Sequence, residues 1–149
     1  MAVSVLQVAR TIGDLSGWRL SNLALQKIAY VAEMIHLGRT GQPLSTSDFQ
    51  AWDRGPVSPE LYHWAKMYGS SPVKPDIFQR VSPLPPHSGE YSAVASAYDA
   101  MKDLSPWQMV DVTHQSDGAW AEYYQAGRKG VVIPKHRIAQ EYHVRITED

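Results

Sequence analysis

One segment constrains the fold more than any other: residues 21–38 predict a helix that is apolar over most of its circumference. Its apolar and mixed side chains fall on two neighbouring stripes at helical spacing, Leu25, Ile28, Ala29, Ala32 and Ile35 on one and Leu23, Lys27, Tyr30, Met34 and Leu37 on the other. Ser21 or Asn22 can cap its start, and Gly38 offers a left-handed stop. A helix of this kind belongs at the centre of a domain, so the rest of the chain must fold around it.

Shorter helices are predicted on both sides of this segment. Apolar spacing and capping residues place them at residues 3–15, 59–68, 92–104, 105–112, 117–124 and 133–146. Residues 49–52 fit a brief strand or an extended segment. We therefore expect a mainly α fold, a single compact helical domain of about six or seven helices with at most one or two short strands, covering residues 1–149.

A proline-rich connector separates the two halves of the pattern. Residues 69–89 contain five of the ten prolines, interleaved with serine and glycine, so no regular element is expected to persist there. We interpret it as a long, mobile loop. The spacing of Pro83 and Pro86 also matches a PxxP ligand, but a plain connector is the favoured interpretation.

Composition excludes several classes of function. The 149 residues carry a formal net charge of −1, which argues against a basic DNA-binding domain. Cysteine is absent, which excludes disulfides, thiolate nucleophiles and cysteine-bound metal centres. The chain has neither a signal-peptide pattern nor a run near the roughly 18 apolar residues of a membrane span, so we expect a cytoplasmic protein.

The polar residues match no catalytic or metal-binding motif. HExxH, EF-hand and GxSxG patterns and glycine-rich phosphate loops are all missing from the sequence. We therefore expect no enzyme activity, no metal and no cofactor. The cluster of Asp111, Thr113, His114 and Asp117 is interpreted as helix capping, and the alternative is a hydrolase in which His114 works with Asp111 or Asp117.

Charge is distributed unevenly over the second half of the chain. Residues 90–122 hold six acidic residues and one lysine, whereas residues 128–145 hold five basic residues and one glutamate. Complementary patches of this kind steer a protein partner, although ordinary solvated faces give the same pattern. Nucleic-acid binding by the basic tail, through Arg128, Lys129, Lys135 and Arg137, is the less favoured interpretation.

Aromatic residues point to a binding surface. The chain has 5 Trp and 8 Tyr, and such rings dominate the energetics of interfaces. Trp52 and Arg54 beside the Gly55–Pro56 turn, with Tyr62 on the outward side of the next helix, are the first candidates for partner contact. The alternative is that Trp52 and Trp64 wedge two helices together.

Three motifs resemble a known family. The segments LQKIAY at residues 25–30 and AWDRGPVSPELY at residues 51–62 are similar to the LxKLxY and AWxxGPVxPELY signatures of the Panacea domain, the SocA-like (phage-associated GepA-type) antitoxin family. Leu104, residues 112–114 and residues 118–120 resemble its later L…LTH…PW element. The resemblance covers roughly residues 4–143, with Ile28 in place of the usual leucine and Ala119 in place of the usual proline.

The resemblance implies an antitoxin that neutralises a protein toxin, encoded next to it, by direct binding. The alternatives are an adaptor that delivers the toxin to the ClpXP protease and a phage-associated structural or regulatory protein. To the contact residues Trp52, Arg54 and Tyr62 the motifs add Lys27, Tyr30, His114 and Trp120. The motif residues expected to hold the fold are Gly55, Pro56, Val57, Pro59, Glu60, Leu61 and Thr113. The toxin's identity and the oligomeric state stay open.

Overall fold

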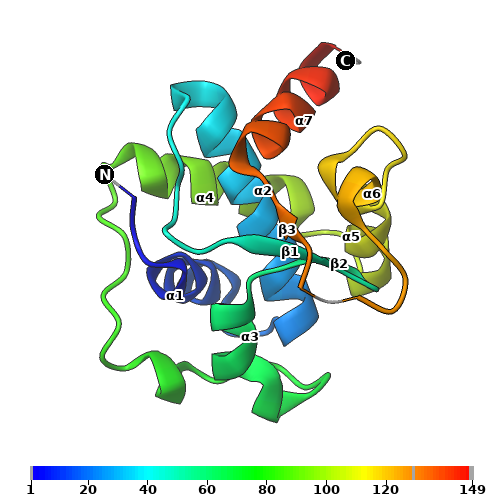
Figure 1. Cartoon of the computed structure of the whole chain (residues 1–149). Helices are drawn as coiled ribbons and strands as arrows, with labels where there is room; N and C mark the ends of the chain where they lie inside the picture. Colours follow the sequence, from blue (N-terminus) through cyan, green and yellow to red (C-terminus); the bar gives the residue numbers. More distant parts are fainter. Residues whose placement is uncertain (1, 129, 148–149) are drawn as a thin grey trace.

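The structure is a computed structural model that describes residues 2–128 and 130–147. This part of the chain forms a mainly α fold, which confirms the predicted fold class (Figure 1). The helices are α1 (Val5–Ser16), α2 (Asn22–Thr40), α3 (Pro59–Ala65), α4 (Gly89–Met101), α5 (Pro106–Thr113), α6 (Ala119–Tyr123) and α7 (Lys135–Thr147). Three short strands, β1 (Phe49–Trp52), β2 (Gly55–Val57) and β3 (Val132–Ile133), form an antiparallel sheet in the order β2-β1-β3.

Helix α2 is the centre of the molecule, as its apolar circumference predicts. It runs through the middle of the fold and contacts α1, α3, α4, α5, α7 and β2 (Figure 1). Most of its side chains are buried, including those of Lys27 and Glu33. The other elements therefore occupy positions set by their contacts with α2.

The C-terminal end of α2 differs from the prediction. The helix continues past Gly38 to Thr40, and Gly41 takes the left-handed conformation with φ of 73°. Gly38 instead permits close packing of α7, because a Cβ atom at this position would lie 1.8 Å from Cδ2 of Tyr142. The helix stop is thus three residues later than expected.

Serine hydroxyls set the starts of the first five helices. Each accepts a hydrogen bond from a backbone N–H in the first turn, and the residues are Ser4, Ser21, Ser58, Ser88 and Ser105. Helix α3 passes into a 3₁₀ turn, η1 (Lys66–Tyr68), which together with α3 covers the predicted span of 59–68. Helix α4 begins at Gly89, three residues before the predicted start at residue 92, because Ser88 and not a later residue caps it.

The proline-rich connector packs against α1. Its apolar residues Val73, Phe78 and Leu84 are buried, and Pro75–Phe78 form a 3₁₀ turn, η2. The Arg10 guanidinium donates to the Phe78 carbonyl oxygen at 3.0 Å, and the Leu84 N–H donates to Thr11 Oγ1 at 2.9 Å. The prediction that no regular element persists in this connector is therefore wrong at η2.

The third strand was also unexpected. β3 contains only two residues, Val132 and Ile133, too few to show an alternating pattern in the sequence. Its pairing with Phe49 and Gln50 of β1 brings the start of α7 onto the core.

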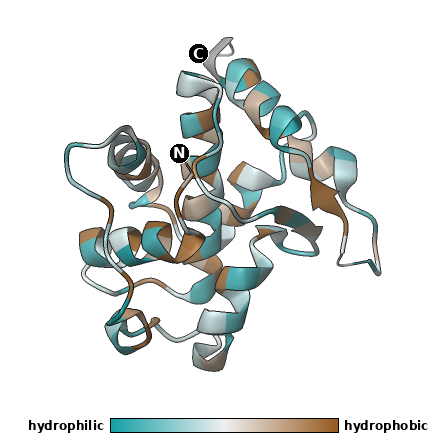
Figure 2. Cartoon of the chain, turned by 60° about the vertical axis from the view of Figure 1, so that its left-hand side comes forward, coloured by the Kyte–Doolittle hydropathy of each residue, from teal (hydrophilic) through white to brown (hydrophobic). Residues whose placement is uncertain are grey.

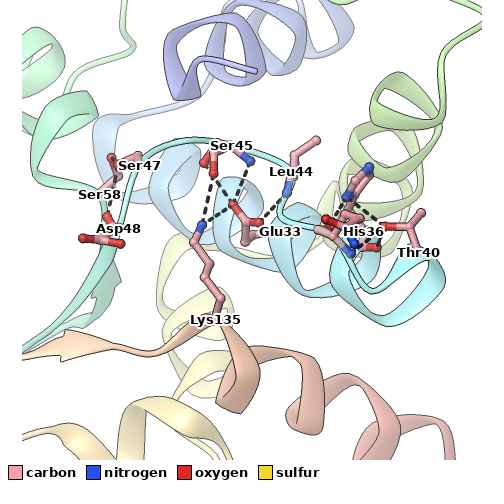
Figure 3. A network of polar contacts seen from close by, with 10 residues as sticks. Glu33, His36, Thr40, Leu44, Ser45, Ser47, Asp48, Ser58 and Lys135 are labelled. Carbon is pink, nitrogen blue, oxygen red and sulfur yellow. Dashed lines mark hydrogen bonds and ion pairs between the residues drawn. The ribbon is translucent and has the colours of Figure 1, made fainter. Parts of the chain in front are cut away.

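A buried carboxylate joins α2 to this start of α7 (Figure 3). Glu33 accepts hydrogen bonds from the backbone N–H groups of Leu44 at 2.6 Å and Ser45 at 3.1 Å. It also forms an ion pair with Lys135 Nζ at 2.8 Å. This network holds three separate segments of the chain together.

Hydrophobic and hydrophilic residues alternate along the outer helices, as expected of elements with one buried face (Figure 2). Among residues 2–128 and 130–147, no helix has both the length and the apolar character needed to cross a membrane.

Candidate functional site

A cleft of about 540 Å³ opens where the β1–β2 turn meets the starts of α2 and α5. The rings of Trp52, Tyr62 and Trp107 and the side chain of Arg54 line it. Trp52 and Tyr62 meet edge to face with ring centroids 5.0 Å apart, and the Arg54 guanidinium lies 5.5 Å from the centroid of Trp107. The structure therefore brings the candidates Trp52, Arg54 and Tyr62 to one site.

Trp107 is a lining residue that the sequence analysis missed. It follows Pro106 in the first turn of α5 and is 62% exposed. Its signal in the sequence was a large aromatic residue in the first turn of a helix, directly after a capping serine and a proline. Trp64, by contrast, is outside the cleft and stacks on Phe78 of the connector, with centroids 5.8 Å apart.

Two of the other motif residues support the β1–β2 turn from behind. Trp120 Nε1 donates to the backbone oxygen of Trp52 at 2.7 Å, and its ring stacks on His114 with centroids 3.6 Å apart. The Tyr124 hydroxyl donates to Asp53 Oδ1 at 2.6 Å. His114 and Trp120 thus hold the turn that presents Trp52 and Arg54.

Lys27 reaches the same turn from inside the core. Its Nζ donates to the Pro56 oxygen at 3.1 Å, and its side chain is fully buried. Burial lowers the pKa of Lys27 to about 7. Burial also lowers the pKa of His114, and the positive charge of Lys27 adds to that effect. Both groups favour their neutral forms more than exposed side chains do.

Gly55 makes this arrangement possible. Its φ of 115° lies in the region that favours glycine, and a Cβ atom would come within 2.9 Å of both Lys27 Cε and Thr113 Oγ1. The turn, the lysine and the end of α5 therefore pack together only because residue 55 has no side chain.

Lys27 and Tyr30 require a correction as contact residues. Both side chains are fully buried, and the Tyr30 hydroxyl donates to Glu141 Oε1 at 2.7 Å. Burial, and next the charge of Glu141, raise the pKa of Tyr30 well above its usual value. Both side chains support the elements packed around them.

The motif residues expected to hold the fold occupy the turn and the start of α3. Gly55, Pro56, Val57, Leu61 and Thr113 are buried, while Pro59 and Glu60 form the first turn of α3. Gln26, a further residue of the LQKIAY segment, holds the start of α3 against α2. Its side-chain amide exchanges two hydrogen bonds with the backbone of Ser58, at 2.8 and 3.2 Å.

The polar cluster near His114 lies at the end of α5 and in the loop before α6. Asp111 and Asp117 are exposed. The Thr113 hydroxyl donates to the Val110 oxygen at 3.1 Å within its own helix. Gly118 precedes α6 without a side-chain cap from the described residues, and the His114 backbone N–H closes α5, so the side chains of this cluster do not cap either helix as the sequence analysis expected.

The basic tail is largely engaged within the molecule. Lys135 pairs with Glu33, Arg137 with Glu122, and Arg145 with Glu141. Lys129 lies outside the described residues. Pairing with Glu33, Glu122 and Glu141 therefore neutralises part of the basic segment within the molecule.

Comparison with known proteins identifies the family of this chain. Residues 25–121 match the family described as "Antitoxin SocA-like, Panacea domain", a span that includes the β1–β2 turn and the start of α5. "Antitoxin SocA" of Caulobacter vibrioides is 33% identical over 109 residues, which are 68% of this chain and 58% of that protein. The chain thus spans less than two thirds of the length of this curated relative. No solved structure gives a significant match. The chain belongs to the SocA-like Panacea domain family.

Proposed function

We propose that this protein is a cytoplasmic antitoxin that neutralises a protein toxin, encoded by a neighbouring gene, by binding it directly. Membership of the SocA-like Panacea family and the similarity to a curated antitoxin support this role. In this proposal the protein acts by contact and not by catalysis.

The observation that carries the proposal is the cleft beside the β1–β2 turn. Trp, Tyr and Arg are the residue types that contribute most to protein interfaces, and this cleft gathers Trp52, Arg54, Tyr62 and Trp107. The Trp120 hydrogen bond and the close packing at Gly55 hold the turn in place before any partner binds. A preformed site of this kind reduces the entropy lost on association.

Co-expression with the product of the adjacent gene tests the proposal. We expect restored growth, together with a complex that co-elutes on size exclusion. Restored growth without a complex, accompanied by protease-dependent loss of the toxin, would favour the adaptor alternative. Failure to restore growth and to form a complex contradicts the proposal.

A second measurement tests whether the residues that line the cleft contact the toxin or only stabilise the fold. Tyr62→Ala removes a lining ring from the half-buried face of α3, so we expect weaker toxin binding with little loss of stability. His63→Ala, on the exposed side of the same helix and outside the cleft, is the matched control. Equal toxin affinity of the two variants would count against the cleft as the contact surface.

A further inference from the structure

A second hollow of about 190 Å³ adjoins the cleft. Ser21, Ser70 and Pro106 line both spaces, Arg54 lines the first, and Arg19 lines the second. We call the two adjoining hollows the groove. Adjoining hollows suit an extended segment better than a compact small molecule.

The groups that contact the guanidinium groups of the two arginines are neutral. Within the described residues, Arg54 makes no ion pair, and its guanidinium lies over the Trp107 ring. Arg19 donates to the Tyr98 hydroxyl at 3.2 Å and to the Lys102 carbonyl oxygen at 3.0 Å. Asp53 is the carboxylate among the described lining residues, and the Tyr124 hydroxyl already donates to it. The groove therefore has an excess of positive charge.

Two helix N-termini add to this potential. Both α2 and α5 begin in the groove, through Asn22 and Leu23 and through Pro106 and Trp107. Neither helix has an acidic residue in its first turn. The partial positive charge at each helix start thus lacks the carboxylate that commonly offsets it.

We infer that the groove binds an extended acidic segment of the toxin, with its carboxylates against Arg54 and Arg19 and an apolar side chain against the rings of Trp52, Tyr62 and Trp107. This inference rests on the proposed function and specifies the chemistry of the partner. Charge complementarity and the aromatic walls together select acidic segments that also carry an apolar residue.

Charge reversal in the groove tests the inference with the purified toxin as the probe. We expect Arg54→Glu and Arg19→Glu each to weaken toxin affinity about tenfold or more, measured by isothermal titration calorimetry. Arg80→Glu makes the same charge change at an exposed site outside the groove, so affinity should stay within about twofold of the wild type. Circular dichroism and thermal unfolding check that each variant folds.

The possible outcomes separate the inference from the proposed function. Overlapping peptides spanning the toxin should bind only where acidic and apolar residues are adjacent, and should compete with the whole toxin. Wild-type affinity of both arginine variants overturns the groove assignment and leaves direct binding intact. Absence of any complex with the wild-type protein overturns both. Displacement of the toxin by GTP or ATP, with no peptide binding, would assign the groove to a nucleotide instead.

Discussion

At the scale of single residues, a buried lysine makes the stability of the protein depend on pH. Burial lowers the pKa of Lys27 from 10.5 to about 7. Between these values the unfolded chain binds more protons than the folded one, so the free energy of unfolding rises with pH. Below about pH 7 both states are protonated, and the desolvation penalty is present in full.

Replacement of this lysine should remove that pH dependence. We expect the stability of Lys27→Met relative to the wild type to fall by about 3 kcal/mol between about pH 6 and pH 9, because only the wild type gains stability as Lys27 deprotonates. Urea unfolding at several pH values measures the difference. Lys74→Met, at an exposed position, is the control and should show no such trend. If the stability difference between Lys27→Met and the wild type does not change with pH, the lowered pKa of Lys27 is not the cause of the pH dependence.

Alanine substitutions at Gly55 and Gly41 distinguish the cost of backbone strain from the cost of steric crowding. Both have positive φ, but a Cβ at Gly41 meets nothing within 4 Å, whereas one at Gly55 comes within 2.9 Å of two side-chain atoms. We expect Gly41→Ala to reduce the free energy of unfolding by about 1 kcal/mol. Gly55→Ala should reduce it by about 3 kcal/mol or more, as measured by urea unfolding. Equal losses would show that crowding at Gly55 is relieved by small shifts.

At the scale of elements, the packing of α7 on α2 depends on the glycine at position 38. A Cβ there would overlap the Tyr142 ring, so we expect Gly38→Ala to lower the free energy of unfolding by about 3 kcal/mol. In a Tyr142→Ala background the same change should be nearly neutral, which a double-mutant cycle detects. If Gly38→Ala lowers the free energy of unfolding by the same amount in that background, overlap with the Tyr142 ring is not the cause.

The sequence predicted elements well where local signals decide them. Apolar spacing located the helices, and the serines before α2, α3 and α5 marked their starts, because these signals act within one turn. The start of α4 was predicted three residues too late. The end of α2, the 3₁₀ turn in the connector and β3 depend on distant partners. Gly38 marks the approach of Tyr142 and not a helix stop, and the prolines of residues 69–89 lie between apolar residues that α1 buries. Such outcomes need the tertiary fold and cannot be inferred from the segment itself.

At the scale of the whole molecule, the cleft joins elements that are far apart in sequence. Its predicted residues Trp52, Arg54 and Tyr62 come from one continuous motif, so their proximity could be predicted from the sequence. Trp107 and Arg19 complete the groove only through the placement of α5 and of the segment before α2. The burial of Lys27 and the internal pairing of the basic tail were likewise set by global packing.

A hydrogen-exchange footprint of the complex tests this arrangement. If toxin binding uses the groove, amide exchange should slow at residues 19–23, 52–57 and 105–108 together, because one ligand covers all three. Residues 135–145 of α7 line neither hollow and should keep the exchange rates of the free protein. Protection confined to α7 would place the partner on a different surface.

The central position of α2 also determines the order in which the protein can fold as it is synthesised. Tyr30 and Glu33 leave the ribosome long before Glu141 and Lys135, which are their partners in the finished fold. Until those residues emerge, the surface of α2 that α7 covers stays open to chaperones and proteases. A nascent chain halted before residue 135 therefore lacks the partners of α2 and is exposed to degradation, and the arrival of α7 completes this part of the core.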